Sequence, residues 1–312
     1  MKAVRFHEFG GPDVLRYEDV EQPVPGAGEV LLRVAGSGFN AVDAGIRGGY
    51  LQEPFPVMLP HTPGIEVAGT VEALGDAVDQ VKVGDPVIAF LPMTADGAAA
   101  EYAIAPVESL VSAPTKIPLA DAAGLPMIGL TAWQALFDDA GLQPGQRVLI
   151  NGAGGGVGGY AVQLAKGSGA YVIATASPRS VERVRSAGAD EVIDHTMSEV
   201  TLTEPVDVLL NLAPIAPEAL VTLAAHVHPG GVVVNSVPTV PTPTDEERGV
   251  RGVGVFVRND AQQLAHLVDL VDRGELHVDV TERVPLNDLA ALHSRAEAGA
   301  VSGKAIVIPV AA

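Results

Sequence analysis

The stretch that most limits the possible folds covers residues 147–166 and reads RVLINGAGGGVGGYAVQLAK. It begins with a short apolar run just after Pro144 and Gly145, which are typical of a turn. A cluster of glycines follows, and the spacing of apolar residues after position 159 predicts a helix. A buried strand, a glycine turn and a helix in this order predict the opening of a dinucleotide-binding βαβ unit.

The glycine spacing alone is weak evidence in a chain with 35 glycines, because a G-x-G-x-x-G spacing arises here by chance about 0.4 times. Only the readings inside this stretch follow a predicted strand and open a predicted helix. The two possible registers are Gly154, Gly156 and Gly159, or, with a leading alanine, Ala153, Gly155 and Gly158. Backbone N–H groups and the positive end of the helix would meet the pyrophosphate in either register. The turn residues predicted to bind it are Gly154, Gly155, Gly156, Val157 and Gly158.

The residues after the second predicted strand indicate which cofactor binds. NAD-binding chains end this strand with an Asp or Glu that holds the ribose 2′-OH, but residues 171–177 end without an acid. Ser177, Arg179 and Arg183 follow instead, and hydroxyl and guanidinium groups suit a 2′-phosphate. For Arg183, a solvated helix face is an equal alternative. We therefore predict NADPH, with Ser177 and Arg179 at its 2′-phosphate.

Charge and cysteine content exclude several classes of protein. The formal net charge of −19 repels phosphate backbones and anionic membranes, so we expect neither nucleic acid nor a membrane as a partner. The chain has no cysteine, which excludes disulfides, thiolate nucleophiles and cysteine-ligated metals. We find no secretion signal after Met1 and no run of about 18 apolar residues. We therefore expect a cytoplasmic protein.

Two patterns divide the chain. Residues 1–123 contain short apolar or alternating runs between glycine and proline breakers, which predicts a mostly β domain, in the form of a compact barrel. Residues 124–258 alternate predicted strands and helices, which predicts an α/β doubly wound parallel sheet. A helix is predicted over 262–271, and residues 259–312 are expected to rejoin the first domain.

Several collinear motifs resemble one family over essentially the whole chain. They are GFNAVD at 38–43, PGIEVAGTV at 63–71, VGDPV at 83–87, GLTA at 129–132, and the glycine turn followed by QLAK at 163–166. With these motifs the chain resembles the medium-chain dehydrogenase/reductase superfamily and, within it, the zinc-free quinone oxidoreductases similar to zeta-crystallin. The resemblance implies a GroES-like β-barrel catalytic domain formed by 1–123 and 259–312, and a Rossmann cofactor domain over 124–258.

Missing metal ligands favour this branch. Zinc-dependent relatives carry a Cys where Asn40 stands, a His where Ile65 stands, and a four-cysteine lobe that this chain lacks. A catalytic zinc needs about three protein ligands, and neither Asn40 nor Ile65 supplies one. His61 lies close in sequence, but a single His is rarely a metal site. We therefore expect no metal, and reduction of a polarised acceptor rather than oxidation of an alcohol.

The resemblance implies hydride transfer from NADPH to a quinone or to the β-carbon of an α,β-unsaturated carbonyl. It places Asn40, Tyr50 and Thr131 near the nicotinamide, where Asn40 and Tyr50 can donate hydrogen bonds to a developing oxyanion and Thr131 can hold the carboxamide. Tyr50 as a cover of the barrel mouth and Thr131 as an ordinary helix residue are the alternatives. Asp43 with Arg47 suits a helix start or an ion pair. The resemblance adds four residues at the cofactor: His195, Phe256, Val257 and Lys304. For His195, an ordinary polar end of a strand is an equal alternative.

Two other functions share these residues. One is reduction of an enoyl thioester or a biosynthetic intermediate, which differs only in the shape of the pocket. The other is a non-catalytic protein that keeps the NADPH fold for structural or sensory use. Because the family commonly forms dimers through the edge strand of the cofactor domain, we expect a homodimer, with residues 250–257 as the candidate interface.

Overall fold

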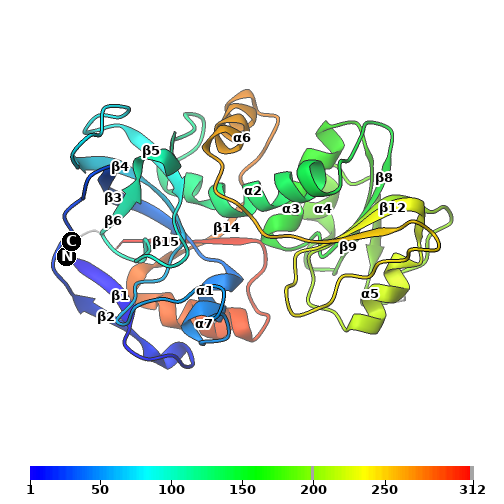
Figure 1. Ribbon diagram of the computed structural model, residues 1–312, viewed down its shortest axis with the longest axis horizontal. Coiled ribbons are helices and arrows are strands. Elements are labelled where there is room, and N and C mark those ends of the chain that lie inside the picture. Colours follow the sequence, from blue (N-terminus) through cyan, green and yellow to red (C-terminus); the bar gives the residue numbers. More distant parts are fainter. Residues whose placement is uncertain (198–199, 310–312) are drawn as a thin grey trace. The chain divides into compact units, whose positions relative to one another are not determined.

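The computed structural model describes residues 1–197 and 200–309 (Figure 1). The chain divides into two compact units. Unit 1 consists of Met1–Met127, Asn259–Gly274 and Val278–Ala312, and unit 2 of Ile128–Arg258 and Glu275–His277. Among the helices of the described ranges, none is both long enough and apolar enough to cross a bilayer.

A seven-stranded sheet is the framework of unit 1. Its strands follow the order β14 (Val280–Pro285), β15 (Lys304–Ile308), β3 (Glu29–Gly38), β4 (Glu66–Leu74), β5 (Pro86–Phe90) and β7 (Leu110–Ser112). β6 (Tyr102–Pro106) also pairs with β3. All pairings are antiparallel except that of β14 with β15. The strands bury an apolar cluster that includes Val30, Val67 and Val87, so the mostly β character predicted for this region is confirmed.

Helices from both ends of the chain complete the core of unit 1. α7 (Leu289–Glu297) lies next to α1 (Ala41–Arg47), orange beside blue in Figure 1. Ile46 of α1 and Leu292 of α7 belong to one apolar cluster, together with Phe6 of β1 (Lys2–Phe6), which pairs with β2 (Leu15–Asp19). α6 (Ala261–Arg273) buries one apolar face, at the spacing that the sequence predicts.

Unit 2 contains a six-stranded sheet in which all strands are parallel. Their order is β10 (Glu191–Asp194), β9 (Tyr171–Ala176), β8 (Arg147–Asn151), β11 (Val206–Asn211), β12 (Val227–Asn235) and β13 (Arg251–Gly254). Crossover helices include α3 (Gly156–Gly167), α4 (Val181–Ser186) and α5 (Pro217–Ala224). This is the 3-2-1-4-5-6 order of a doubly wound nucleotide-binding sheet, so the predicted fold class is confirmed. The order reverses between β8 and β11, and ligands of such sheets bind outside the carboxyl ends of the strands at that point.

The edge strand expected within residues 250–257 is β13, which covers Arg251–Gly254. Gly254 pairs with Asn235, the last residue of β12, and the Val255 N–H donates to the Asn235 carbonyl at 2.9 Å. Phe256 and Val257 therefore lie past the end of the strand pairing. A strand extends only as far as its neighbour offers backbone groups, which the local sequence does not reveal.

Candidate active site

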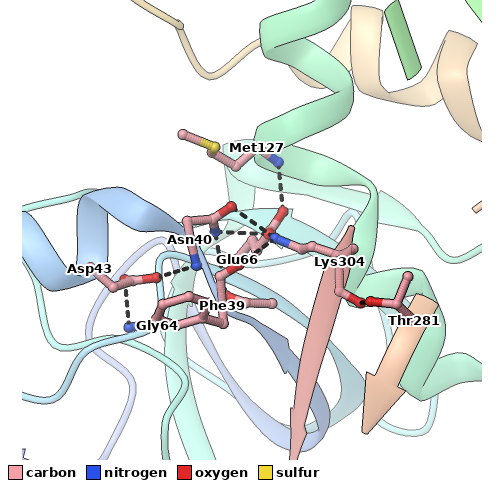
Figure 2. Close-up of polar contacts among 9 residues, drawn as sticks. Phe39, Asn40, Asp43, Gly64, Glu66, Met127, Thr281 and Lys304 are labelled. Atoms are coloured by element: carbon pink, nitrogen blue, oxygen red, sulfur yellow. Dashed lines mark hydrogen bonds and ion pairs between the residues drawn. The ribbon is translucent and has the colours of Figure 1, made fainter. Parts of the chain in front are cut away.

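A buried ion pair joins two strands of unit 1. Lys304 is the first residue of β15 and Glu66 the first of β4, and their exposed fractions are 3 % and 0 %. The Lys304 ammonium donates to Glu66 Oε1, to Asn40 Oδ1 at 2.8 Å and to the Phe39 carbonyl at 2.9 Å (Figure 2). An ammonium has three hydrogens to donate. All three therefore have acceptors inside unit 1.

Asn40 stands between the two charges. Its Nδ2 group donates to Glu66 Oε1 at 2.8 Å and to the Gly38 carbonyl at 3.3 Å. The second oxygen of Glu66 accepts the Met127 N–H at 2.8 Å, in the first turn of α2 (Pro126–Trp133). Position 38 must be glycine, because a Cβ there would lie 2.2 Å from Glu66 Oε1. The close approach of β3 to the carboxylate thus depends on a missing side chain.

Asp43 adds a second acid to this cluster. It accepts the Asn40 N–H at 2.9 Å and the Gly64 N–H at 3.1 Å (Figure 2). Burial raises the pKa of Asp43 to about 6, against the lowering effects of these two N–H groups and of the Lys304 charge. By accepting the Asn40 N–H, Asp43 caps the start of α1. Arg47 pairs with Glu297 and donates to His293 Nδ1 at 3.3 Å instead.

The glycine turn of unit 2 joins β8 to α3, and the structure separates the two registers that the sequence leaves open. A Cβ at Gly158 would lie 2.5 Å from Ala153 Cα, whereas a Cβ at Gly159 would meet no atom within 4 Å. The last glycine of the fingerprint allows close packing of helix on strand. Gly158 has this property and Gly159 does not, which favours the register Ala153, Gly155 and Gly158.

A chain of neutral side-chain hydrogen bonds crosses the carboxyl ends of four strands of unit 2. Thr175 Oγ1 of β9 donates to Asn151 Oδ1 of β8 at 2.8 Å and accepts the Gly152 N–H at 3.0 Å. Asn151 Nδ2 donates to Asn211 Oδ1 of β11 at 2.7 Å, and Asn211 Nδ2 donates to Asn235 Oδ1 of β12 at 2.9 Å. We call the four side chains of Thr175, Asn151, Asn211 and Asn235 the amide ladder. It fixes the strand ends beneath the glycine turn.

Residues predicted for the 2′-phosphate lie just past β9. Ser177 is half-buried and Arg179 is exposed. Arg183 donates from its guanidinium to the Gly154 carbonyl at 2.6 Å, so it contacts the glycine turn rather than forming only a solvated helix face. His195 follows β10, is exposed, and donates its N–H to the Ala176 carbonyl at 3.3 Å. Unit 2 therefore brings the turn, Arg183 and the end of β9 together.

The other predicted residues are divided between the two units. Tyr50, in the loop after α1 in unit 1, has a side chain that is 86 % exposed. Thr131 is buried in α2 within unit 2, and Phe256 is 67 % exposed. Val257 is half-buried. Unit 1 brings Asn40 and Lys304 into contact, and the roles of all these residues toward a cofactor or substrate stay predictions.

Sequence reasoning misses Glu66 and the amide ladder, although both leave a signal. Glu66 is an acid inside the apolar run 65–71, where a buried carboxylate needs a partner. Three predicted strands, ending at 151, 211 and 235, each end in Asn. A repeated polar residue at the carboxyl ends of parallel strands predicts contact across the sheet.

Comparison with known proteins identifies the family. Residues 26–115 match the alcohol dehydrogenase GroES-like domain and residues 187–307 match the family described as zinc-binding dehydrogenase. The chloroplastic quinone-oxidoreductase QR1 of Triphysaria versicolor is 33 % identical, over 99 % of this chain and 98 % of the relative. The human quinone oxidoreductase is also 33 % identical, with the same coverage. The chain belongs to the medium-chain dehydrogenase/reductase superfamily. Within it, the chain is a member of the quinone oxidoreductase branch.

Solved structures agree with this assignment. The quinone oxidoreductase of Coxiella burnetii has a TM-score of 0.90 at 28 % identity, covering 99 % of each chain. That of Pseudomonas syringae has a TM-score of 0.87 at 32 % identity, also covering 99 % of each. A mycobacterial protein complexed with NADPH has a TM-score of 0.87 at 29 % identity, covering 99 % of this chain and 100 % of its own. The predicted GroES-like and Rossmann architecture of this superfamily member is confirmed.

Zinc does not fit the residues of this superfamily member. Across residues 1–197 and 200–309, no group of three or more His, Asp or Glu side chains could hold a metal ion. The Lys304 ammonium already contacts Asn40 Oδ1 and the Glu66 carboxylate, and it would repel a second cation placed there. His61 is buried and forms a T-shaped pair with Phe6, with 5.3 Å between the ring centroids. The donor set of unit 1 therefore suits an internal ammonium, not a zinc ion.

Proposed function

We propose that this enzyme is an NADPH-dependent reductase that transfers a hydride to a quinone or to an α,β-unsaturated carbonyl. The main support for NADPH comes from the residues that follow β9. Ser177 and Arg179 lie where an NAD-binding chain has an acid. A carboxylate at this place would repel a 2′-phosphate, and a guanidinium attracts it. The NADPH bound to one structural neighbour supports the same cofactor. When bound, NADPH supplies the hydride chemistry.

The protein's own residues would hold and orient this cofactor. The turn from Gly154 to Gly158 presents backbone N–H groups at the start of α3, where the helix dipole favours negative charge. Arg183 donates to the Gly154 carbonyl and so helps to fix the turn. Phe256, Val257 and His195 are proposed contacts of the same cofactor. Lys304 has a weaker case, because its three donors already have internal acceptors.

Two residues that flank α1, Asn40 before it and Tyr50 in the loop after it, would serve the acceptor. Tyr50 can donate its hydroxyl to the oxyanion that develops on a reduced carbonyl, and its 86 % exposure leaves that hydroxyl accessible. Asn40 has both amide hydrogens on internal acceptors. A donor role for Asn40 therefore requires one of these bonds to break, the bond to the Gly38 carbonyl at 3.3 Å being the longer. Thr131 is the proposed contact of the nicotinamide carboxamide.

We also propose a homodimer joined through the edge of the parallel sheet. β13 is the last strand in the sheet order, and an edge strand offers backbone groups for pairing. Residues 250–257, which include β13, are the proposed interface. Sedimentation velocity at micromolar concentration would measure the assembly, and a monomer would contradict it.

Oxidation of NADPH, followed at fixed enzyme concentration against a panel of acceptors, tests the proposal. The panel contains quinones, 2-alkenals, enones and enoyl thioesters, with NADH as the control. We expect turnover with a quinone or enone and a lower KM for NADPH than for NADH. Arg179→Ala should raise the KM for NADPH about tenfold, the loss of one charge-assisted contact, and leave the KM for NADH unchanged.

Arg185→Ala is the matched control, because Arg185 is an exposed arginine nearby that pairs with Glu182 at 2.9 Å. This substitution should change neither KM. A preference for NADH would contradict the role given to Ser177 and Arg179. Turnover of enoyl thioesters alone would shift the substrate class, and NADPH binding without turnover of any acceptor would favour a non-catalytic role.

A further inference from the structure

Three oxygen acceptors of different chemical kinds converge on one buried point of unit 1. They are the Phe39 carbonyl, the Asn40 side-chain oxygen and the Glu66 carboxylate, and the Lys304 ammonium binds all three (Figure 2). The lysine stem reaches this point past Gly124, where a Cβ would lie 3.3 Å from Lys304 Cγ. The carboxylate and the ammonium are both buried. The geometry is that of a cation site whose cation is covalently attached to the chain.

The two charges also decide which way the Asn40 amide points. Its oxygen faces the ammonium at 2.8 Å, and its NH₂ group faces the carboxylate at 2.8 Å. A reversed amide would place the NH₂ group on the ammonium and the oxygen on the carboxylate, so both contacts would become repulsive. The orientation therefore follows from the ion pair and depends on both of its members.

We propose that Phe39 O, Asn40 Oδ1 and the Glu66 carboxylate form a cation site, that the Lys304 ammonium is its resident cation, and that Lys304 is a positioning residue that fixes the Asn40 amide for the reaction. The positioning role rests on the proposed function, because only that function places Asn40 near the reacting atoms. The cation site stands on the contacts alone.

Removal of the ammonium should leave an unfilled site. Asp43 and Glu66 are the acids of this cluster and Lys304 is its base, so Lys304→Ala leaves two buried acids in one cluster without a cation. The substitution removes Cγ, Cδ, Cε and Nζ of the side chain. n-Propylammonium contains the same four heavy atoms and is cationic at neutral pH, so it can replace what was removed.

Thermal unfolding of the full chain tests the site without any cofactor. We expect Lys304→Ala to melt about 10 °C below the wild type, and n-propylammonium to recover roughly half of this loss in a saturable way. Wild type, and the double variant Lys304→Ala with Glu66→Gln, should not respond. Tetramethylammonium, which cannot donate hydrogen bonds, and n-propanol, which has no charge, are the ligand controls and should have no effect.

An absence of saturable stabilisation of Lys304→Ala would overturn the cation site, and so would equal stabilisation of the wild type. If Lys304→Ala does not fold on expression, it is refolded from urea with and without n-propylammonium. A higher yield with the amine supports the site, and equal yields overturn it.

Kinetics then test the positioning role separately. We expect Lys304→Ala to lose about tenfold or more in kcat with little change in the KM for NADPH, and n-propylammonium to restore kcat over the same concentrations that restore the melting temperature. If n-propylammonium restores the melting temperature of Lys304→Ala but leaves its kcat low, the role of Lys304 is purely structural. That result would overturn the positioning role alone. If the wild type reduces no acceptor, the proposed function fails, whereas the melting temperatures still decide whether the cation site exists.

Discussion

The two units bury their polar groups in opposite ways. Unit 1 holds a charged cluster, in which Lys304, Glu66 and Asp43 are at most 3 % exposed. Unit 2 holds the amide ladder, whose members are also buried but carry no charge. An anionic diphosphate would be repelled by carboxylates near the glycine turn, so neutral amides can fix the strand ends there without opposing the cofactor. The charged cluster instead contains its own cation, the Lys304 ammonium, and the burial of each charge depends on the opposite charge.

The largest expected effect comes from breaking the ion pair of unit 1. Glu66→Leu leaves the Lys304 ammonium buried without its carboxylate, which should lower the free energy of unfolding by about 3–5 kcal/mol. Glu66→Leu combined with Lys304→Met removes both charges and should recover most of this loss, because a neutral apolar pair has no desolvation penalty to offset. Urea unfolding followed by circular dichroism measures both variants.

A matched control and a second signal make this test specific. Asp19→Ala removes an exposed partner of Lys2, paired at 2.7 Å, and should leave the unfolding curve unchanged. Trp133, the single tryptophan, lies in unit 2, so its fluorescence separates the unfolding of unit 2 from the total signal. If the double variant were as unstable as Glu66→Leu, the loss would come from packing, and the contrast between the units would fail.

The next effect is a loss of stability with rising pH that the charged cluster should show and the amide ladder should not. The pKa of Asp43 rises from 3.8 to about 6 on folding, so between these values the folded state binds a proton that the unfolded state has lost. The contribution of Asp43 to stability is therefore present below pH 4 and is lost as pH rises through 6, by up to about 3 kcal/mol. Asp43→Asn removes this titration. Its stability relative to the wild type should become more favourable between pH 4 and 6.

Asn211→Ala is the comparison from the neutral ladder. Its loss of stability comes from broken hydrogen bonds, so the difference from the wild type should stay constant over the same pH range. His293, whose pKa burial and Arg47 lower to about 3, gives the wild type a slope of opposite sign below pH 6.5. The difference between each variant and the wild type cancels this contribution to first order. A flat difference for Asp43→Asn would contradict the raised pKa.

The local sequence predicts the backbone of each unit better than it predicts these clusters. The glycine turn, the parallel sheet and the β-rich first region follow from turn residues and periodic apolar runs, which are local signals. The contact between Asn40 and Lys304 joins residues 264 positions apart, and the sequence alone does not place β15 beside β3. The ladder likewise depends on the register that pairs Asn211 with Asn151 and Asn235. Tertiary pairing creates these contacts, so periodicity could not predict them.

The smallest effect concerns the glycine turn, where unit 2 depends on backbone contact instead of charge. Gly158→Ala places a methyl group 2.5 Å from Ala153 Cα, so the glycine turn and α3 must move apart, at a cost of about 1–3 kcal/mol. NADPH affinity, measured by calorimetry, should fall in parallel. Gly159→Ala, one residue further along the same helix, has open space and should keep the affinity and raise stability by about 0.4–1 kcal/mol. Equal effects of the two substitutions would mean that the close packing at Gly158 does not select the register.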